Sequence, residues 1–258
     1  MGNEPEPDRV EAALAHLRQA IRDKVRAEQL LDGLTNLAND MALEEWLQEK
    51  LGSGGDFWLA FIEVDHFKRI NDVFTYQNAD IFLKRIAEVL FGAARNHLPT
   101  GTVPFRAHGD EFYLAGELVD DFDPAAIAAA LEHVRAGVAL IRIPVRVGAG
   151  VTGSTVIKGT VSVGWLTSQD SRTAPEELDS RSVRAHLELA VGVAKRTRDT
   201  VTRFDPKMRK SDEIDGRADC ADCQTKFTFR TPVAVVRPGP LACPNCGTPV
   251  ARPPVGRP

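Results

Sequence analysis

The sequence lacks several features that mark specialised classes of protein. Among its 258 residues, no apolar run approaches the roughly 18–20 residues that a membrane-spanning helix needs, so we expect no membrane partner. The segment Met1–Pro7 is acidic and polar, unlike a secretory signal, and we therefore expect a cytoplasmic protein. The net charge of −4 and the pI near 5.9 show none of the overall basic character typical of nucleic-acid-binding proteins.

Cysteine is absent from the first 219 residues and then occurs four times. Cys220 and Cys223 form one Cys-x-x-Cys pair, and Cys243 and Cys246 form a second pair nineteen residues later. In a chain without a secretory signal, this arrangement favours a metal site over disulfides, and the spacing is typical of a four-thiolate zinc ribbon. We expect structural Zn²⁺ here, because so small a module does not fold without metal. The partner of the module, protein or nucleic acid, stays open.

The rest of the composition is that of an ordinary folded protein, with 43% hydrophobic and 26% charged residues. Shifts in composition and breaks at glycine and proline divide the chain into five parts. We expect an N-terminal helix in residues 1–31, a main domain in residues 32–206, a charged linker in residues 207–218, a zinc ribbon in residues 219–250 and a disordered tail in residues 251–258.

The N-terminal segment has the periodicity of a helix from Asp8 to about Leu31. Its apolar residues recur every three or four positions, at Val10, Leu14, Leu17 and Ile21. Two interpretations are open: the stripe packs on the chain's own domain, or it pairs with a second copy as a coiled coil.

Patterns in the main domain predict alternating strands and helices. In order they are a turn and helix at Leu34–Leu51, a strand at Phe57–Val64, a helix at Asn78–Ala94 with Ile81, Ile86, Leu90 and Phe91 on its apolar side, a hairpin at Val103–Ala107 and Glu111–Ala115, a helix at Pro124–Ile141, strands at Val145–Val151 and Thr160–Trp165, a helix at Ser182–Arg196 and a strand at Val201–Phe204. This order predicts an α+β fold with a mainly antiparallel sheet flanked by helices.

Acidic residues stand at the ends of two predicted strands. Glu63 and Asp65 are two residues apart, so they face the same side unless the strand has already ended. Asp110 and Glu111 lie at the tip of the predicted hairpin. Carboxylates gathered by a sheet can hold Mg²⁺, which neutralises charge and activates the attacking hydroxyl in phosphoryl transfer. The alternative is that these side chains are simply solvated.

Six segments, in the right order, resemble the GGDEF (diguanylate cyclase) family over about residues 30–205. They are DGLTNLAN at residues 32–39, FIEVDHFKRIND at 61–72, YQNAD at 76–80, RAHGDEF at 106–112, TVSVG at 160–164, and AK at 194–195 with Arg198 nearby. The resemblance implies a nucleotidyl-cyclase, palm-like fold and an enzyme that joins two GTP molecules into cyclic di-GMP with Mg²⁺ or Mn²⁺. It also implies a homodimer in which each protomer binds one GTP, and the N-terminal helix is our candidate for the dimer contact.

Carried over position by position, the resemblance implies roles for individual residues. The metal site would include Glu63, Val64 and Asp110. The catalytic residues would be Asp110, Glu111 and Lys195, with Glu111 assisting the attacking 3′-hydroxyl. Nucleotide binding would fall to six residues, of which two recognise guanine (Asn71 and Asp80), two meet the triphosphate together with Lys195 (Lys68 and Arg198), and two lie against the nucleotide (His108 and Gly109).

Departures from the family's pattern surround the nucleotide. His108 replaces a glycine, Glu63 replaces an aspartate, Thr75 and Tyr76 replace Gly-His, and Ala79 replaces another glycine. The metal-site carboxylates all persist, which favours a catalytic domain. The reshaped loop favours the alternative of a degenerate, non-catalytic domain that binds nucleotide or a partner protein. A third hypothesis, a polymerase-like protein associated with nucleic acid, is disfavoured by the net negative charge.

Overall fold

The computed structural model describes residues 7–118, 123–146, 154–173, 178–208, 213–224, 226–232, 241–242, 245–246 and 248–250. The chain divides into two compact units, residues 1–206 and residues 207–258. The division falls where the sequence analysis places the end of the main domain. Within the described residues, no helix combines the length and the apolar character needed to cross a membrane.

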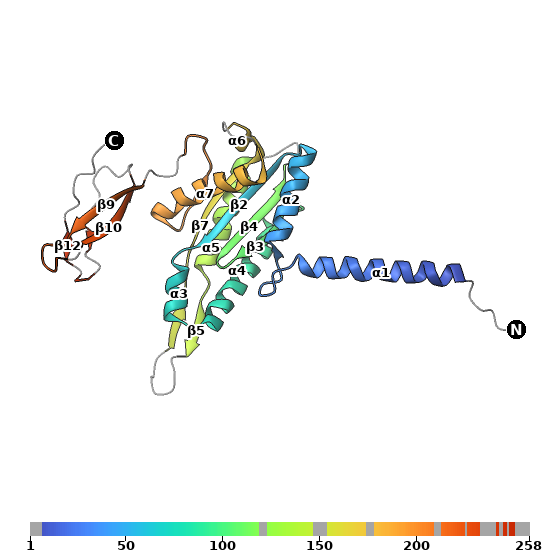
Figure 1. The fold of residues 1–258 in the computed structure, drawn as a ribbon, viewed down its shortest axis with the longest axis horizontal. Helices are drawn as coiled ribbons and strands as arrows, with labels where there is room; N and C mark the ends of the chain where they lie inside the picture. Colours follow the sequence, from blue (N-terminus) through green and yellow to red (C-terminus); the bar gives the residue numbers. More distant parts are fainter. Residues whose placement is uncertain are drawn as a thin grey trace. The chain divides into compact units, whose positions relative to one another are not determined.

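The larger unit is built on a six-stranded sheet (Figure 1). In spatial order its strands are β1 (Ala38–Asn39), β3 (Val103–His108), β4 (Glu111–Glu117), β2 (Phe57–Val64), β7 (Val161–Thr167) and β8 (Val201–Arg203). The four inner strands pair antiparallel, whereas β1 and β8 pair parallel with β3 and β7 at the two edges. The predicted α+β fold with a mainly antiparallel sheet is confirmed.

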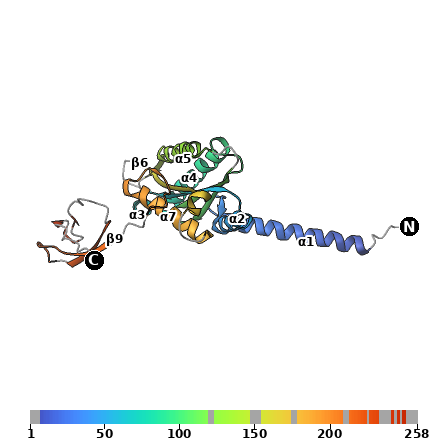
Figure 2. The same cartoon turned by 90° about the horizontal axis from the view of Figure 1, so that it is seen from above.

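Helices cover both faces of this sheet (Figure 2). On one face lie α2 (Asp40–Ser53) and α7 (Ser180–Thr197), and on the other lie α4 (Tyr76–Asn96) and α5 (Pro124–Ala139). The near-continuous apolar run of β2 is typical of a strand that is buried on both faces. Phe57 meets Trp46 of α2 edge to face at 5.7 Å, whereas the next residue, Trp58, joins the core cluster with residues of α4 and α5.

Shorter elements complete the larger unit. Helix α3 (Phe67–Val73) follows β2 after two residues, and α6 (Ser168–Arg172) follows β7 directly. Strands β5 (Ile143–Arg146) and β6 (Ser154–Ile157) form an antiparallel hairpin of their own. The predicted strand at Val145–Val151 therefore differs from β5, and its residues 147–151 lie outside the described ranges. Helix α3 has no counterpart among the predicted elements.

Helix α4 shows where the periodicity misplaces two side chains. Ile81 and Phe91 were expected on its apolar side but are 43% and 53% exposed. The buried positions recur at spacings of three and four and comprise Ala79, Phe82, Leu83, Ile86, Ala87, Leu90 and Ala93. Ile81 and Phe91 lie beside this stripe, so the expectation was wrong for them and right for Ile86 and Leu90.

The N-terminal segment forms α1 (Pro7–Gln29), as the periodicity predicts. Side chains of Val10, Leu14 and Leu17 lie outside those that the structure describes. Ile21, the fourth member of the predicted stripe, is 54% exposed. At this position the helix does not pack on its own domain.

Among its described residues, the smaller unit has two antiparallel strand pairs. Strand β9 (Glu213–Asp219) pairs antiparallel with β10 (Lys226–Pro232), and β11 (Leu241–Ala242) pairs with β12 (Pro249–Val250). The linker expected at residues 207–218 is wrong for its second half, because β9 begins at Glu213. The sequence analysis missed this strand because its residues are mostly charged. The expected tail, residues 251–258, lies outside the described residues.

Candidate functional site

Three carboxylates from neighbouring strands meet at one end of the sheet. Glu63, near the end of β2, stands directly opposite Glu111, the first residue of β4, in the antiparallel ladder. Asp110 precedes Glu111 at the hairpin tip, and its backbone carbonyl accepts a hydrogen bond from the Val64 N–H at 3.3 Å. Strand pairing therefore gathers Glu63, Val64, Asp110 and Glu111, which belong to segments almost fifty residues apart in the sequence.

The cluster is short of positive charge. Burial raises the pKa of the Asp110 carboxyl, and the nearby charge of Glu63 raises it further. Burial also raises the pKa of Glu111, and Glu63 and Asp110 add to this shift against the opposing effect of His108. Carboxylates that are partly desolvated and close to one another need a cation if they are to stay ionised together.

Lys195 supplies part of that charge, and His108 also contacts the cluster. Lys195, in the last turn of α7, forms an ion pair with Glu63 through its Nζ. His108 Nε2 lies 3.0 Å from Glu111 Oε2, although 73% of the His108 side chain is exposed. A register shift in β3 between Arg106 and His108 places His108 directly opposite Glu111, as β-bulges commonly re-aim a side chain.

Arg106 braces the hairpin tip. Its Nη1 donates to both carboxylate oxygens of Asp32 at 2.9 and 3.0 Å, and its Nε and Nη2 donate to the Gly109 carbonyl at 3.1 and 2.7 Å. Burial alone would raise the pKa of Asp32, but hydrogen bonds from Thr35 and Arg106 outweigh burial and hold this pKa below its usual value. Gly109 has a φ of +55°, which favours glycine. Sequence reasoning gave Arg106 and Asp32 no role, although both stand in the family-like segments.

Asp65 follows the end of β2. Strand alternation predicted that it would face the same side as Glu63 and could help to hold a metal, whereas the family resemblance gave it no role. Its carboxylate accepts hydrogen bonds from the hydroxyls of Thr160 and Ser162, each at 2.7 Å, and from the Asp199 N–H at 3.1 Å. Arg198 Nη1 lies 4.0 Å from the same carboxylate. Asp65 thereby joins β2 to β7 and to the connection between α7 and β8. With every described partner inside the protein, it serves as a structural anchor.

The nucleotide-binding candidates come from four parts of the larger unit. Lys68 and Asn71 are three residues apart on α3, so they share one face of that helix. Asp80 stands near the start of α4, and Arg198 directly follows α7 with a φ of +60°. His108 and Gly109 are exposed at the hairpin tip. Because α3 follows β2 after two residues, Lys68 and Asn71 stand next to the carboxylate end of β2.

The altered loop before Asp80 has a structural explanation. The Thr75 hydroxyl accepts hydrogen bonds from the Asn78 backbone N–H at 3.4 Å and from the Asn78 side-chain amide at 3.0 Å, so Thr75 caps the start of α4. Ala79 is buried in the core, whereas Tyr76 is 78% exposed. Two of the departures therefore support α4 near Asp80: Thr75 caps the start of the helix, and Ala79 packs in the core.

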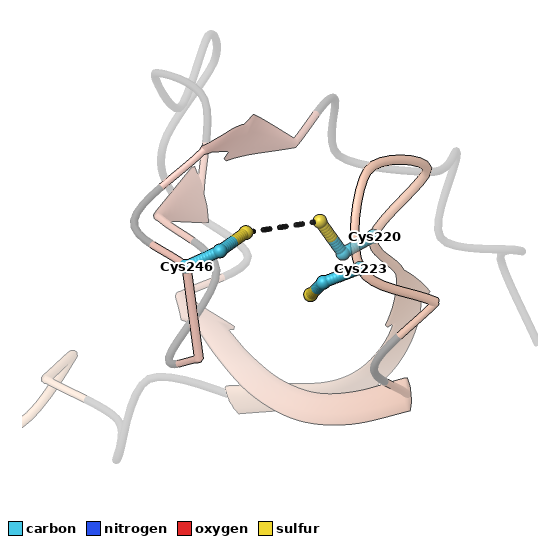
Figure 3. Close-up of side chains that lie close together, drawn as sticks. All are labelled: Cys220, Cys223 and Cys246. Carbon is cyan, nitrogen blue, oxygen red and sulfur yellow. Dashed lines mark hydrogen bonds between the residues drawn. The ribbon is translucent and has the colours of Figure 1, made fainter.

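A candidate metal centre lies in the smaller unit (Figure 3). The sulfurs of Cys220, Cys223 and Cys246 all lie within 4.8 Å of one another, and the Cys220 and Cys246 sulfurs are 3.6 Å apart. A tetrahedral Zn²⁺ with bonds of about 2.3 Å to sulfur separates its ligands by about 3.8 Å, close to this spacing. Cys243, the expected fourth ligand, lies outside the described residues.

The local fold presents these thiols as a zinc knuckle does. The Gln224 N–H donates to the Cys220 carbonyl at 2.9 Å and closes the turn that carries Cys220 and Cys223. A backbone hydrogen bond from Cys223 lowers the pKa of the Cys220 thiol, but desolvation and sharing with the neighbouring thiols outweigh it and raise this pKa to about 11. A bound cation would favour the thiolate form of Cys220, whereas a hydrogen bond with the Thr248 side chain already lowers the pKa of Cys246.

Comparison with protein families gives one match. The sequence model described as "Diguanylate cyclase, GGDEF domain" matches residues 29–205. The chain is 37% identical to diguanylate cyclase DgcP of Pseudomonas aeruginosa over 118 residues, which is 44% of this chain and 16% of DgcP. It is 29% identical to the cyclic di-GMP phosphodiesterase NbdA of the same organism over 193 residues, which is 72% of this chain and 22% of NbdA. The matches span less than a quarter of these two relatives.

Solved structures show the same fold. The coiled coil and GGDEF domain of DgcB from Caulobacter crescentus, in complex with c-di-GMP, has a TM-score of 0.59 and 27% identity, and the match covers 76% of this chain and 96% of that chain. Diguanylate cyclase SiaD from Pseudomonas aeruginosa, in complex with its activator SiaC, has a TM-score of 0.54 and 27% identity, with 76% and 71% covered.

Proposed function

The chain belongs to the GGDEF, or diguanylate cyclase, family, and from this premise we propose that it condenses two molecules of GTP into cyclic di-GMP and releases pyrophosphate. The observation that carries the proposal is the cluster of Glu63, Asp110 and Glu111, held together by strand pairing with Lys195 in contact. The raised pKa values of Asp110 and Glu111 indicate a site built for a cation and for proton transfer.

The donor set of this cluster fits Mg²⁺ or Mn²⁺. Hard divalent cations prefer carboxylate and carbonyl oxygens, which Glu63, Asp110 and the Val64 backbone would supply. Burial and repulsion from Glu63 both disfavour the ionised form of Asp110, and a bound cation would offset these effects. When bound, the ion would neutralise phosphate charge and lower the pKa of the attacking hydroxyl.

The chain's own residues would perform the remaining steps. Glu111 would accept the proton of the 3′-hydroxyl, and burial raises the pKa of its carboxyl, which makes it a stronger base. The 3′-oxygen would form a bond to the α-phosphorus of the other GTP, and the bond from that phosphorus to the departing pyrophosphate would break. Lys68, Lys195 and Arg198 would meet the charge of the triphosphate and of the pyrophosphate.

Base recognition would come from residues on two helices, α3 and α4. A carboxylate such as that of Asp80 accepts hydrogen bonds from N1–H and N2–H of guanine, and the amide of Asn71 both donates and accepts. Asp80 lies near the capped start of α4, and Asn71 lies on α3. Guanine specificity would therefore survive the altered loop at Thr75 and Tyr76.

A homodimer would complete the reaction. Cyclic di-GMP contains two phosphodiester bonds, and the described residues of one chain hold one such carboxylate cluster. Two chains that face each other would present two GTP molecules for mutual attack. Helix α1, whose Ile21 is exposed, is the proposed dimer contact.

A degenerate domain that binds nucleotide without turnover is the second candidate. The observation that favours it is the 3.0 Å contact between His108 and Glu111, which engages the proposed base where the family has glycine. Such a domain would signal through its helix or through its zinc module. Its signature would be tight GTP binding with no pyrophosphate release.

The proposed activity is tested by pyrophosphate release from GTP with Mg²⁺ or Mn²⁺ over a range of protein concentrations. We expect specific activity that rises with concentration as dimers form, and its loss in Asp110→Asn. Glu49→Gln on α2 likewise neutralises one carboxylate, at an exposed position, so it is the control and should retain activity. If the protein binds GTP but releases no pyrophosphate at any protein concentration, the domain is degenerate and non-catalytic instead.

The smaller unit is proposed to hold one structural Zn²⁺ through Cys220, Cys223, Cys243 and Cys246. The sulfur spacing of the three described cysteines supports this assignment. A closed four-thiolate site leaves no open position for catalysis. The ion would then fold a module that can contact another macromolecule.

A further inference from the structure

A cavity separate from the proposed active site lies against α3. Its volume is ≈ 580 Å³, and its lining residues come from α3 and the turn before it, the end of α5, β6 and the turn before β7. Figure 1 shows α3 and β5 at the same end of the larger unit. None of the residues that we assign to metal, catalysis or nucleotide binding lines this cavity. It is therefore a site without an assigned ligand.

Helix α3 divides this cavity from the nucleotide-binding candidates. The residues of the α3 region that line it are His66, Arg69, Ile70, Val73 and Phe74, spaced by three, one, three and one. This spacing defines one face of a helix. Lys68 and Asn71 fall on the opposite face, because each lies about half a turn from that stripe. One short helix thus contacts two sites.

The charge of the cavity is positive. Arg69, Arg142 and Lys158 line it, and all three are exposed. Arg142 is held in place because its Nη1 donates to the Ala139 and Ile141 carbonyls at 2.7 Å each. Among the described lining residues the one acid is Asp65, whose carboxylate already accepts three hydrogen bonds from within the protein. An anion would meet three cations and no competing free carboxylate.

Apolar side chains also line the cavity, and two of them are well exposed. Val73 is 64% exposed and Val156 is 42% exposed, and Ile70 and Phe74 also line the cavity. Exposed apolar side chains around a hollow are common where a ligand contributes an apolar or planar group. A bare inorganic ion would leave this surface uncovered.

We propose that the α3 cavity binds a small organic phosphate of mononucleotide size and that its occupancy changes the affinity of the proposed active site for GTP. The volume lies within the roughly 300–1,000 Å³ of small-molecule sites. The three cations match a phosphate group, and the apolar wall matches a base or another planar group. The second half of the proposal rests on the proposed function, because it concerns GTP at Lys68 and Asn71.

The physical route of coupling is α3 itself. The helix has seven residues, and Ile70 is its buried position. A ligand that draws Arg69 and Val73 toward the cavity would turn or shift the whole helix, together with Lys68 and Asn71 on its other face. Linkage then requires the effect to be reciprocal: GTP changes the affinity for the effector by the same factor.

Binding is tested on the full chain by amide NMR during titration with adenosine 5′-monophosphate and no divalent metal. We expect shifts at Ile70, Lys158 and Gly159 that saturate at one ligand per chain. The double variant Arg69→Glu, Lys158→Glu should weaken this binding at least about tenfold, the loss expected for charge-assisted hydrogen bonds. No saturable shift at these amides would overturn the site.

A control separates this cavity from the active site and from general charge effects. Lys84→Glu reverses an exposed charge on α4, away from the cavity lining, and should leave the titration unchanged. The unperturbed amide spectrum of each variant establishes that it is folded. Shifts that fall instead at Lys68 and Asp80 and persist in the double variant would assign the ligand to the nucleotide site, and the proposal would be wrong.

Coupling is tested by GTP binding, measured calorimetrically with Ca²⁺, in the presence and absence of the monophosphate. We expect the dissociation constant for GTP to change in the parent protein and in Lys84→Glu, and to stay constant in the double variant. If the monophosphate leaves the dissociation constant for GTP unchanged in all three proteins, the proposed coupling is wrong, whereas the binding site shown by NMR is unaffected. Failure of catalysis alone would affect neither measurement, so it is distinguishable from failure of this proposal.

Discussion

Asp65 gives the sharpest prediction about how the site is held together. Replacing it by alanine removes the acceptor for two hydroxyls and one backbone N–H. The Ser162 hydroxyl has no access to solvent, so its desolvation remains uncompensated at a cost of about 1–3 kcal/mol. Thr160 and Asp199 are partly exposed and can turn to water, which adds about 0.5–1 kcal/mol each. We expect Asp65→Ala to lower the free energy of unfolding by about 3 kcal/mol.

The assay is urea unfolding followed by circular dichroism. The urea concentration at the midpoint of unfolding should fall. The dependence of the unfolding free energy on urea concentration should not change, because the surface exposed on unfolding is the same. Asp72→Ala removes an exposed carboxylate from α3 and should change stability by less than about 0.5 kcal/mol. Adding Ser162→Ala to Asp65→Ala should cost less than the sum of the single changes, because it removes the stranded hydroxyl. A loss below about 1 kcal/mol in Asp65→Ala, or strict additivity, would refute this reasoning.

Four further predictions follow from other contacts. Gly164→Ala should destabilise the larger unit by about 1–3 kcal/mol in the same urea assay, because the new Cβ would collide with the α7 backbone. Burial would raise the pKa of Asp32, but hydrogen bonds lower it overall. The Asp32 carboxylate therefore contributes its full stabilisation above its ordinary pKa and loses it as the pH falls through the lower pKa of the folded state. In unfolding curves measured at decreasing pH, the stability difference between the parent protein and Asp32→Asn should shrink to zero. His108→Gly should free Glu111 and raise turnover, measured as pyrophosphate release; lower turnover would contradict the assigned contact. Chelation of zinc, or Cys220→Ser, should abolish the amide NMR dispersion of the smaller unit and preserve that of the larger.

The order of elements was predictable because the core strands and helices carry strong local patterns. The apolar, aromatic-rich run at Phe57–Val64 predicts a strand, and the polar pair Asn39 and Asp40 offers an N-cap for the next helix, a role that Asn39 takes in α2. The hairpin at the family signature was also predictable from two apolar segments around Gly109. Each of these signals lies within a few residues of the element it specifies.

The parts that sequence reasoning missed depend on distant contacts. Helix α3 is only seven residues long, too short for periodicity to distinguish it from a turn. The hydrogen bonds of Asp65 come from hydroxyls almost a hundred residues away, of Ser162 on β7 and of Thr160 just before that strand. The contact of His108 with Glu111 follows from a bulge in β3, which no local pattern reveals. Strand β9 is charged and is specified by its pairing with β10.

The central claim is that the carboxylate cluster catalyses condensation of GTP. The most direct measurement is mass spectrometry of the products after the metal-loaded protein is incubated with all four nucleoside triphosphates, beside Asp110→Ala. The account predicts cyclic di-GMP in the parent protein and none in the variant. GTP recovered intact from both, or a product that persists in Asp110→Ala, would contradict it.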